Sequence, residues 1–594
     1  MGGGEQQTGH LPKVVSGRKT EESWQVNTFP KFLARDERTL DGAWDFHWQG
    51  DAGQVEDIDP SRVSFDTVMA VPGVFDALPR YAGERGIGVY RSVVLMATTA
   101  GERLRLVCHG MGLYGRLWWD GRAIGDYDLP YSGVEYDFTT TAGERHELVI
   151  ALDSRFNQEK VPIVRPFYDF CAYGGIYRSL ALQRLPALRL ERVQVTTLDL
   201  ATGRVRLRLC LGGDIPGEVA GAVAFDAGPA QAFRLTPAGN AGILELAVPG
   251  FRVWSPATPH LHTVTVSLAG GDAISERFGL RTIEAVGQEL RLNGQPLRLL
   301  GVNRHEAHPQ YGPALPVQTM VEDLQHLKDL GANFVRCVHY PHDQQFLDLC
   351  DQAGLLVWQE SLGWGNDARD VVSPRFAEAQ VRQTRAMVRH RINHPSVILW
   401  GFLNEFVSDS EAARPLCRSL VETIRQEDSS RLVTYASCRN ERDVCFDLVD
   451  VISMNTYPGW IGDLDWNAHA VTRVAPGVKR LADFASRPPL AGKPFIMSEI
   501  GACGLYGSHS LARVQWTEEF QADYMAEAAR AVLGNPRFCG LALWQMVDSR
   551  SYGPWGQVRT KPNGTNLAGL LDEYRRRKLA FDAVRAVFQE HRKP

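Results

Sequence analysis

Four glutamates follow apolar segments in the C-terminal half of the chain, where carboxyl groups could carry acid–base chemistry. They are Glu306, Glu360, Glu405 and Glu499. Hydrolysis of a glycosidic bond needs two carboxyl groups facing one bond, one to protonate the leaving oxygen and one to attack the sugar or activate water. Glu405 and Glu499 follow two different predicted strands, so they are the candidate pair.

Other chemistries have no matching pattern in the sequence. Two histidine pairs, His305 with His308 and His339 with His342, stand outside any HExxH motif, and no compact cluster of cysteines and histidines accompanies them. The sequence also has no GxSxG nucleophile elbow and no GxxxxGK[ST] phosphate loop. We therefore expect hydrogen-bonding histidines, no metal and no cofactor.

Alternating apolar strands and amphipathic helices from about residue 283 to the C-terminus predict a (β/α)8 barrel. Seven of the eight predicted strands end in polar residues. The carboxyl ends of parallel barrel strands meet at one mouth, so these polar residues should share one pocket. The expected strands cover residues 297–305, 333–339, 355–361, 397–405, 432–437, 450–457, 494–499 and 540–545.

The first half of the chain has the pattern of β-sheet domains. Short alternating runs broken by Gly, Pro and Asp continue to about residue 185 and indicate antiparallel strands. A second block of about 100 residues, with clean alternation at 205–211 and 263–268, suits an immunoglobulin-like sandwich. Residues 1–35 lack periodicity and are expected to form a flexible tail.

Length, charge and cysteine content limit the classes of protein to which the chain could belong. The 594 residues suggest three or four domains of roughly 150 residues each. A net charge of −5 argues against nucleic-acid binding through bulk positive charge. The sequence shows neither a secretory signal nor an apolar stretch of ~18 residues, so no membrane association is expected. Ten cysteines without a CxxC pair favour free thiols and a cytoplasmic location.

The motifs resemble glycoside hydrolase family 2, in the compact architecture of the β-glucuronidases. The most specific segments are NHPSVILWGFLNE at residues 393–405 and KPFIMSE at residues 493–499. The resemblance covers almost everything after residue 36. It implies a multidomain fold: a tail (1–35), a β jelly-roll sugar-binding domain (36–185), an immunoglobulin-like β-sandwich (186–282) and a catalytic (β/α)8 TIM barrel (283–594).

The resemblance also implies roles for single residues in a retaining exo-β-glycosidase. Glu405 would be the general acid/base, with a raised pKa, and Glu499 the nucleophile, which stays ionised about 5 to 5.5 Å away. Tyr457, supported by Asn455, would tune or orient Glu499, and Asn404 would contact the 2-hydroxyl of the sugar. Further residues would line the sugar subsite, namely Asp169, His339 and Trp544. A homo-oligomer, a dimer or tetramer, is also implied.

The sequence departs from the β-glucuronidase pattern where that family grips the substrate carboxylate. The family's Asn-x-Lys motif is missing, because Asn566 is followed by Leu567 and Ala568, and Ile461 replaces an aromatic hydroxyl. We therefore expect a terminal neutral sugar, of the β-galactosidase type. Arg559 and Asn566 remain predicted substrate-binding residues, and Arg559 and Lys561 in the same loop keep a β-glucuronidase or β-galacturonidase as the alternative. A third hypothesis is a non-catalytic carbohydrate-binding protein, against which the presence of both glutamates argues.

Overall fold

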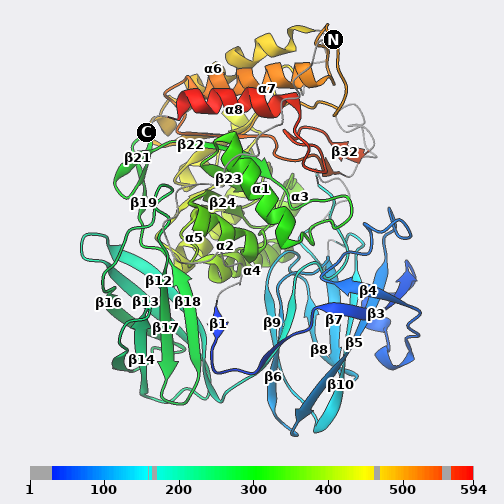
Figure 1. The fold of residues 1–594 in the computed structure, drawn as a ribbon. Helices are drawn as coiled ribbons and strands as arrows, with labels where there is room; N and C mark the ends of the chain where they lie inside the picture. Colours follow the sequence, from blue (N-terminus) through cyan, green and yellow to red (C-terminus); the bar gives the residue numbers. More distant parts are fainter. Residues whose placement is uncertain (1–29, 158–159, 164–169, 461–467, 552–563, 593–594) are drawn as a thin grey trace, which may run out of the picture.

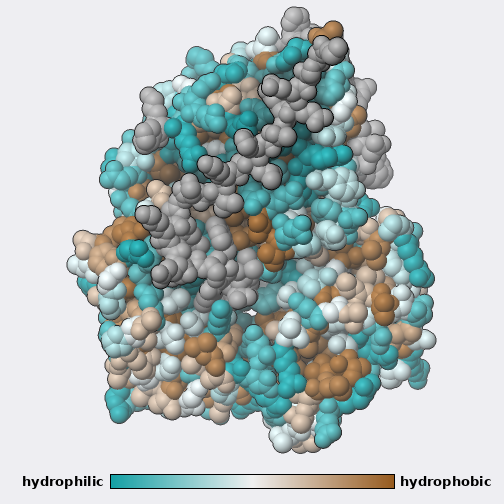
Figure 2. All heavy atoms as spheres, viewed as in Figure 1, coloured by the Kyte–Doolittle hydropathy of each residue, from teal (hydrophilic) through white to brown (hydrophobic). Residues whose placement is uncertain are grey.

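The computed structural model describes residues 30–157, 160–163, 170–460, 468–551 and 564–592. Two β-sandwiches lie side by side below a barrel surrounded by helices (Figure 1). On the face drawn in Figure 2, hydrophobic residues lie in separate patches among hydrophilic ones. Such mixing is ordinary for a folded surface, which always exposes much apolar area.

The first sandwich is a jelly roll made of two antiparallel sheets. Its apolar core lies between them and includes Trp44, Phe46, Tyr90 and Leu148. The larger sheet has the order β4 (Thr67–Val71), β3 (Gly42–Gly50), β5 (Ile87–Thr98), β10 (Gly143–Asp153), β7 (Tyr114–Trp119) and β8 (Arg122–Tyr127). The smaller sheet has the order β2 (Glu37–Thr39), β11 (Leu180–Arg184), β6 (Arg103–Cys108) and β9 (Val134–Thr139).

The second sandwich is immunoglobulin-like, and its strands alternate between buried and more exposed residues, as β17 shows along its whole length. One sheet has the order β1 (Lys31–Phe32), β18 (Ala273–Phe278), β17 (His262–Leu268), β14 (Val219–Phe225) and β15 (Gln231–Leu235). The other has the order β12 (Leu188–Asp199), β13 (Arg204–Gly213) and β16 (Ala241–Ala247).

The prediction of a flexible tail over residues 1–35 is wrong for its last residues. Strand β1 pairs with β18, with Lys31 opposite Ser275, and the buried Arg35 forms an ion pair with Asp272 at 2.9 Å. A two-residue strand is too short to show a periodicity, and its partners lie more than 200 residues away in the sequence. Residues 1–29 lie outside the described part of the chain.

The third unit is a parallel barrel, and all eight predicted strands are confirmed. Its sheet has nine segments because the fifth strand is interrupted at Tyr435 and counts as two, β26 and β27. The segments are β22 (Leu299–Arg304), β23 (Phe334–Cys337), β24 (Leu356–Glu360), β25 (Val397–Gly401), β26 (Leu432–Thr434), β27 (Ala436–Ser437), β28 (Ile452–Asn455), β29 (Phe495–Glu499) and β30 (Gly540–Leu543).

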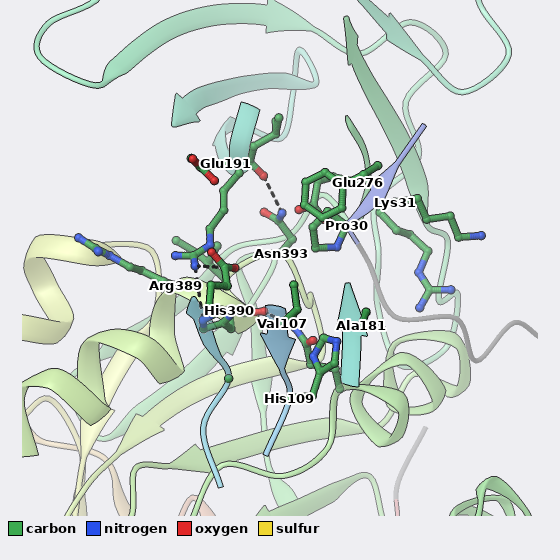
Figure 3. A pocket seen from close by; sticks show the side chains of 18 of the residues that line it. Pro30, Lys31, Val107, His109, Ala181, Glu191, Glu276, Arg389, His390 and Asn393 are labelled. Atoms are coloured by element: carbon green, nitrogen blue, oxygen red, sulfur yellow. Dashed lines mark hydrogen bonds and ion pairs between the residues drawn. The ribbon is translucent and has the colours of Figure 1, made fainter. Parts of the chain in front are cut away.

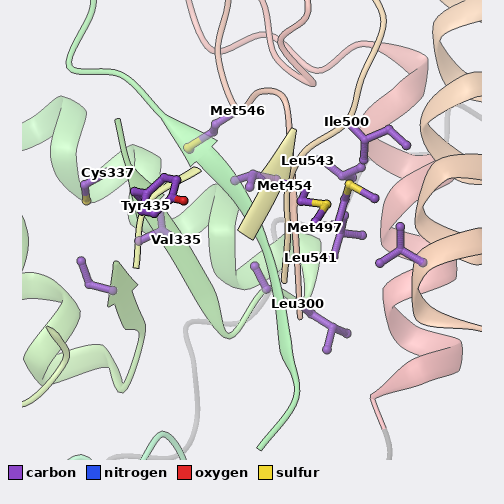
Figure 4. Close-up of a cluster of buried hydrophobic side chains, with 14 of the residues drawn as sticks. Leu300, Val335, Cys337, Tyr435, Met454, Met497, Ile500, Leu541, Leu543 and Met546 are labelled. Carbon is purple, nitrogen blue, oxygen red and sulfur yellow. The ribbon is translucent and has the colours of Figure 1, made fainter. Parts of the chain in front are cut away.

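Helices surround the barrel and bury the outward side chains of its strands, such as Leu300, Val335 and Met497 (Figure 4). Ser373 caps α4 through its Oγ, and Pro374 opens that helix. Among the described residues no helix is long and apolar enough to cross a membrane. The helices are α1 (Val317–Leu330), α2 (Gln344–Ala353), α3 (Ala368–Val371), α4 (Pro374–Arg391), α5 (Arg414–Glu427), α6 (Val474–Ala485), α7 (Glu518–Leu533) and α8 (Leu579–His591).

The inside of the barrel changes from apolar to polar along the strands. At the start of the strands, Leu299, Phe334 and Leu356 pack in one cluster with Trp254 and the hairpin strands β19 (Ile283–Val286) and β20 (Glu289–Leu292). Further along the same strands, the corresponding inward positions hold polar residues, namely Asn303, Arg336 and Glu360. The polar end is the mouth, where barrel proteins place their active sites.

Candidate active site

The four candidate glutamates divide into two groups. Glu306 is a buried ion-pair partner of Arg178 from the jelly roll, with 2.8 Å between Arg178 Nη2 and Glu306 Oε2. Glu360 accepts a hydrogen bond of 2.7 Å from Arg336 Nε at the end of β24. Glu360 shares Arg336 with Glu499, but its other oxygen is occupied by His339. Glu405 and Glu499, linked through Asn455, Asn404 and Arg336, are the candidate catalytic pair.

Glu499 lies at the end of β29 and is 2% exposed. Its Oε1 accepts from Arg336 Nη1 at 2.7 Å and its Oε2 accepts from the Tyr457 hydroxyl at 2.6 Å. Burial raises the pKa of Glu499, and the nearby Arg336 charge and the Tyr457 hydrogen bond act in the opposite direction. Because each oxygen has a strong donor and one donor is a permanent cation, Glu499 is the member of the pair that ionises first.

Glu405 lies in the loop after β25, in the left-handed region with φ 55°. Its backbone N–H donates to Ala436 O at 2.9 Å, and its Oε1 accepts from Asn455 Nδ2 at 2.8 Å. Burial and the negative charge of Glu499 raise the pKa of Glu405 to about 7. A carboxyl group in this environment keeps its proton near neutral pH, as a general acid must.

Arg336 is the central residue of the site, and sequence reasoning missed it. It is fully buried, it lies over the Trp358 ring at 4.5 Å, and it contacts Glu360 and Glu499. Its Nη2 also donates to Asn404 Oδ1 at 2.8 Å. The available signal was a single arginine within the apolar segment of residues 333–338, at an inward-facing position of the strand.

Two predicted amide residues connect the catalytic pair. Asn455 Nδ2 donates to Glu405 Oε1 and, at 3.1 Å, to Asn404 Oδ1. The backbone of Asn404 is held by Gly363 and Gly365, at 2.9 and 2.8 Å. Asn404 Nδ2 is buried and has no partner among the described residues. This donor suits a substrate hydroxyl, because an unsatisfied buried N–H is costly when the site is empty.

His339 and Trp544 form one wall of the mouth. Their rings stack with centroids 5.5 Å apart and an interplanar angle of 14°. His339 Nδ1 donates to Glu360 Oε2 at 3.1 Å, an assignment that follows from the carboxylate acceptor. Burial and the Arg336 charge lower the pKa of His339, so the ring is neutral and its Nε2 is an acceptor without a partner among the described residues.

The predicted substrate residues near the last barrel strand are only partly described. Asn566 is buried in β32 (Thr565–Asn566), which pairs with β31 (Ser549–Arg550), and its Oδ1 accepts from Ala568 N at 3.2 Å. Leu567 and Ala568 then pack against Trp544 and Cys503. Cys503 is therefore a packing residue of the wall. Asp169, Arg559, Lys561 and Ile461 lie outside the described residues.

A cavity of about 510 Å³ lies elsewhere, where the two sandwiches meet the barrel (Figure 3). Glu276 and Asn393 both line it, and Asn393 Nδ2 donates to Val193 O at 2.8 Å. Burial raises the pKa of Glu276 to about 8, which leaves this carboxyl neutral at neutral pH. Neither Glu405 nor Glu499 lines this cavity. We place the active site at the barrel mouth because two carboxyl groups lie there in different environments, one that favours the ionised form and one that favours the protonated form.

Asp348, Asp351 and His394 bring possible metal-ligand atoms within 4.8 Å of one another. Their hydrogen bonds account for this closeness without an ion. His394 Nδ1 bonds Asp351 at 2.6 Å, and Arg277 forms an ion pair with Asp348. His394 precedes the first residue of β25, so the group lies at the end of the barrel opposite the mouth.

Known proteins that are similar to this chain include glycoside hydrolases. Residues 283–537 match the model of the "Glycosyl hydrolases family 2, TIM barrel domain". A family 2 β-galacturonidase from Eisenbergiella tayi, solved with galacturonate, is 31% identical with a TM-score of 0.84, and the match covers 95% of this chain and 99% of that one. A Faecalibacterium prausnitzii β-glucuronidase is 25% identical with a TM-score of 0.82, covering 94% and 98%. A Paenibacillus borealis β-glucuronidase is 25% identical over 95% of this chain and 98% of its own length. The chain belongs to glycoside hydrolase family 2.

Proposed function

We propose that the chain is a retaining exo-β-uronidase that removes a terminal β-linked galacturonic acid. The opposed environments of Glu405 and Glu499 are the observation that carries the reaction type. Glu499 is stabilised as a carboxylate by Arg336 and Tyr457, whereas the pKa of Glu405 is raised to about 7. One group is prepared to attack and the other to donate a proton, which a double displacement requires.

The reaction follows from these positions. Glu499 attacks the anomeric carbon while Glu405 donates its proton to the leaving oxygen, and a glycosyl-enzyme ester forms. Glu405, now a carboxylate, takes a proton from water, which displaces Glu499 and restores both groups. The configuration at the anomeric carbon is inverted twice and is therefore retained. Asn404 Nδ2 donates to a hydroxyl of the sugar during both steps.

The choice of a uronide replaces the neutral sugar that the sequence favours. The missing lysine beside Asn566 weakens the match to the β-glucuronidase clamp, but it leaves other ways to bind a carboxylate open. The chain is more similar to the E. tayi β-galacturonidase, at 31% identity, than to the two β-glucuronidases, at 25%. Arg559 and Lys561 remain the sequence-based candidates for the carboxylate clamp.

A panel of aryl β-glycosides tests the sugar. We expect the galacturonide to have the highest kcat/KM, the glucuronide to follow, and the galactoside and glucoside to be poor substrates. The physical reason is that a site built to bind a buried carboxylate is left with unpaired polar groups when a neutral sugar binds. The measurement is kcat/KM for each aryl glycoside at one pH and salt concentration.

Two other outcomes are informative. Fast cleavage of the β-galactoside, with slow uronides, would return the neutral-sugar hypothesis to first place. Absence of turnover on every glycoside, together with sugar binding in calorimetry, would favour the non-catalytic carbohydrate-binding protein.

The pH dependence of kcat/KM should report the proton on Glu405. Because the acid must be protonated in the free enzyme, activity should fall as the pH rises through about 7. On the acidic side, activity should fall where Glu499 gains a proton. Tyr457→Phe removes a donor to Glu499, so it should move this acidic limb to higher pH. A profile that stays flat from pH 6 to pH 9 would contradict the assignment of Glu405.

A further inference from the structure

The loop between β23 and α2 carries His339, and it is held by the jelly roll rather than by the barrel alone. Arg178, at the end of the sequence YGGIYR, is 2% exposed. Its Nη2 donates to Pro341 O at 2.6 Å and to Glu306 Oε2 at 2.8 Å. Its Nη1 donates to Tyr131 O at 2.7 Å, which ties the same guanidinium to its own domain.

Glu306 completes the clamp from the other side of the loop. Its Oε1 accepts from the backbone N–H of Asp343 at 2.7 Å, two residues after the carbonyl of Pro341. Between His339 and Pro341, the Tyr340 ring stacks on Tyr131 of the jelly roll, with centroids 4.0 Å apart and an angle of 19°. Thus an ion pair, two backbone contacts and one ring stack fix the loop directly after His339.

The barrel also holds His339, whose carbonyl oxygen accepts from Gly363 N at 3.2 Å. Its side chain is held by one hydrogen bond to Glu360, by the Trp544 stack and by ring contacts with His305 and Phe170. Its Nε2 is buried and has no hydrogen-bond partner among the described residues. A shift of about 1 Å in the loop would carry Nε2 out of hydrogen-bond range of a sugar hydroxyl, because such bonds weaken steeply beyond ~3.2 Å.

We propose that Arg178 is a positioning residue for sugar binding: the jelly roll, through Arg178 and Glu306, sets the place of His339 in the sugar subsite. The inference rests on the proposed function, because it assumes that His339 contacts the sugar. It gives the jelly roll a role in substrate affinity without any contact between Arg178 and the substrate.

Arg178→Lys is the test. Lysine keeps the positive charge but lacks the planar guanidinium group, whose N–H donors reach Pro341, Glu306 and Tyr131 at the same time. We expect KM to rise about tenfold, the change that ~1.4 kcal/mol of binding energy produces. We expect kcat and its pH profile to stay within about twofold of the wild type, since the environment of the catalytic pair is unchanged. The substrate is whichever aryl β-glycoside the wild type cleaves fastest.

Two comparisons separate positioning from general damage. Arg35→Lys disturbs another buried ion pair, with Asp272, whose contacts lie in the two sandwiches, so it should lower Tm similarly and leave KM unchanged. In a His339→Ala background, Arg178→Lys should change KM less than about twofold. If Arg178 acts through His339, the effects of the two substitutions on KM are not additive. The same tenfold rise in that background would overturn the inference.

The remaining outcomes are also decisive. If Arg178→Lys does not fold, Glu306→Gln carries the same test, because it keeps an acceptor for Asp343 N and removes the charge opposite Arg178. An unchanged KM in Glu306→Gln would then overturn the inference. A wild type that cleaves no glycoside overturns the proposed function, whereas additive effects in an active wild type overturn the inference alone.

Discussion

Glu499→Gln is expected to lower kcat by about 10⁴-fold or more, on every aryl glycoside that the wild type cleaves. An amide cannot form the glycosyl ester, and no other carboxylate takes its place, because Glu360 is engaged by Arg336 and His339. The loss should not depend on the leaving group, since the attack itself is removed. The measurement is single-turnover hydrolysis, together with Tm.

The fold should survive this change. Glutamine has the shape of glutamate, its carbonyl accepts from Arg336, and its amide group can donate to the Tyr457 oxygen. Arg336 stays paired with Glu360. The matched control is Glu276→Gln, which alters a buried carboxyl that is already neutral at neutral pH and lies outside the barrel mouth. Residual kcat above a tenth of the wild-type value in Glu499→Gln would refute its role as nucleophile.

The barrel and its site could be predicted from the sequence because two strong regularities coincide. Strands that are buried on both sides appear as continuous apolar runs, and parallel strands bring their last residues to one mouth. The polar residues that follow these apolar runs could therefore be predicted to lie close together before any distance was known. They include Glu405, Glu499, Asn404, Asn455 and Tyr457. The hydrogen bonds among these five residues agree with that grouping.

Arg336 was missed by the same reasoning because it stands inside a strand rather than after it. A charged residue in an apolar run looks like an exposed or edge position, and only its inward direction in a closed barrel makes it the partner of Glu360 and Glu499. The pairing of Arg178 with Glu306 was hidden for another reason. The two residues are 128 positions apart, in different domains, and a single sequence holds no signal for such pairs.

Glu405→Gln is expected to have an effect that depends strongly on the leaving group. Glutamine still accepts the hydrogen bond from Asn455, so the network to Asn404 and Arg336 should persist. It has no acidic proton to give. Cleavage of a glycoside with an alkyl or sugar aglycone, whose oxygen must be protonated to leave, should slow by about 10²- to 10⁴-fold.

An activated aryl glycoside should behave differently in Glu405→Gln, because its phenolate leaves without a proton. Formation of the glycosyl-enzyme should then slow by less than about tenfold, while its hydrolysis lacks the general base and becomes rate-limiting. A burst of phenolate followed by a slow steady state is the expected signature, and the fall in kcat/KM above pH 7 should disappear. Equal losses for alkyl and activated aryl aglycones would contradict the assignment. That pattern is the one expected of Glu499→Gln, so the two variants together distinguish the acid from the nucleophile.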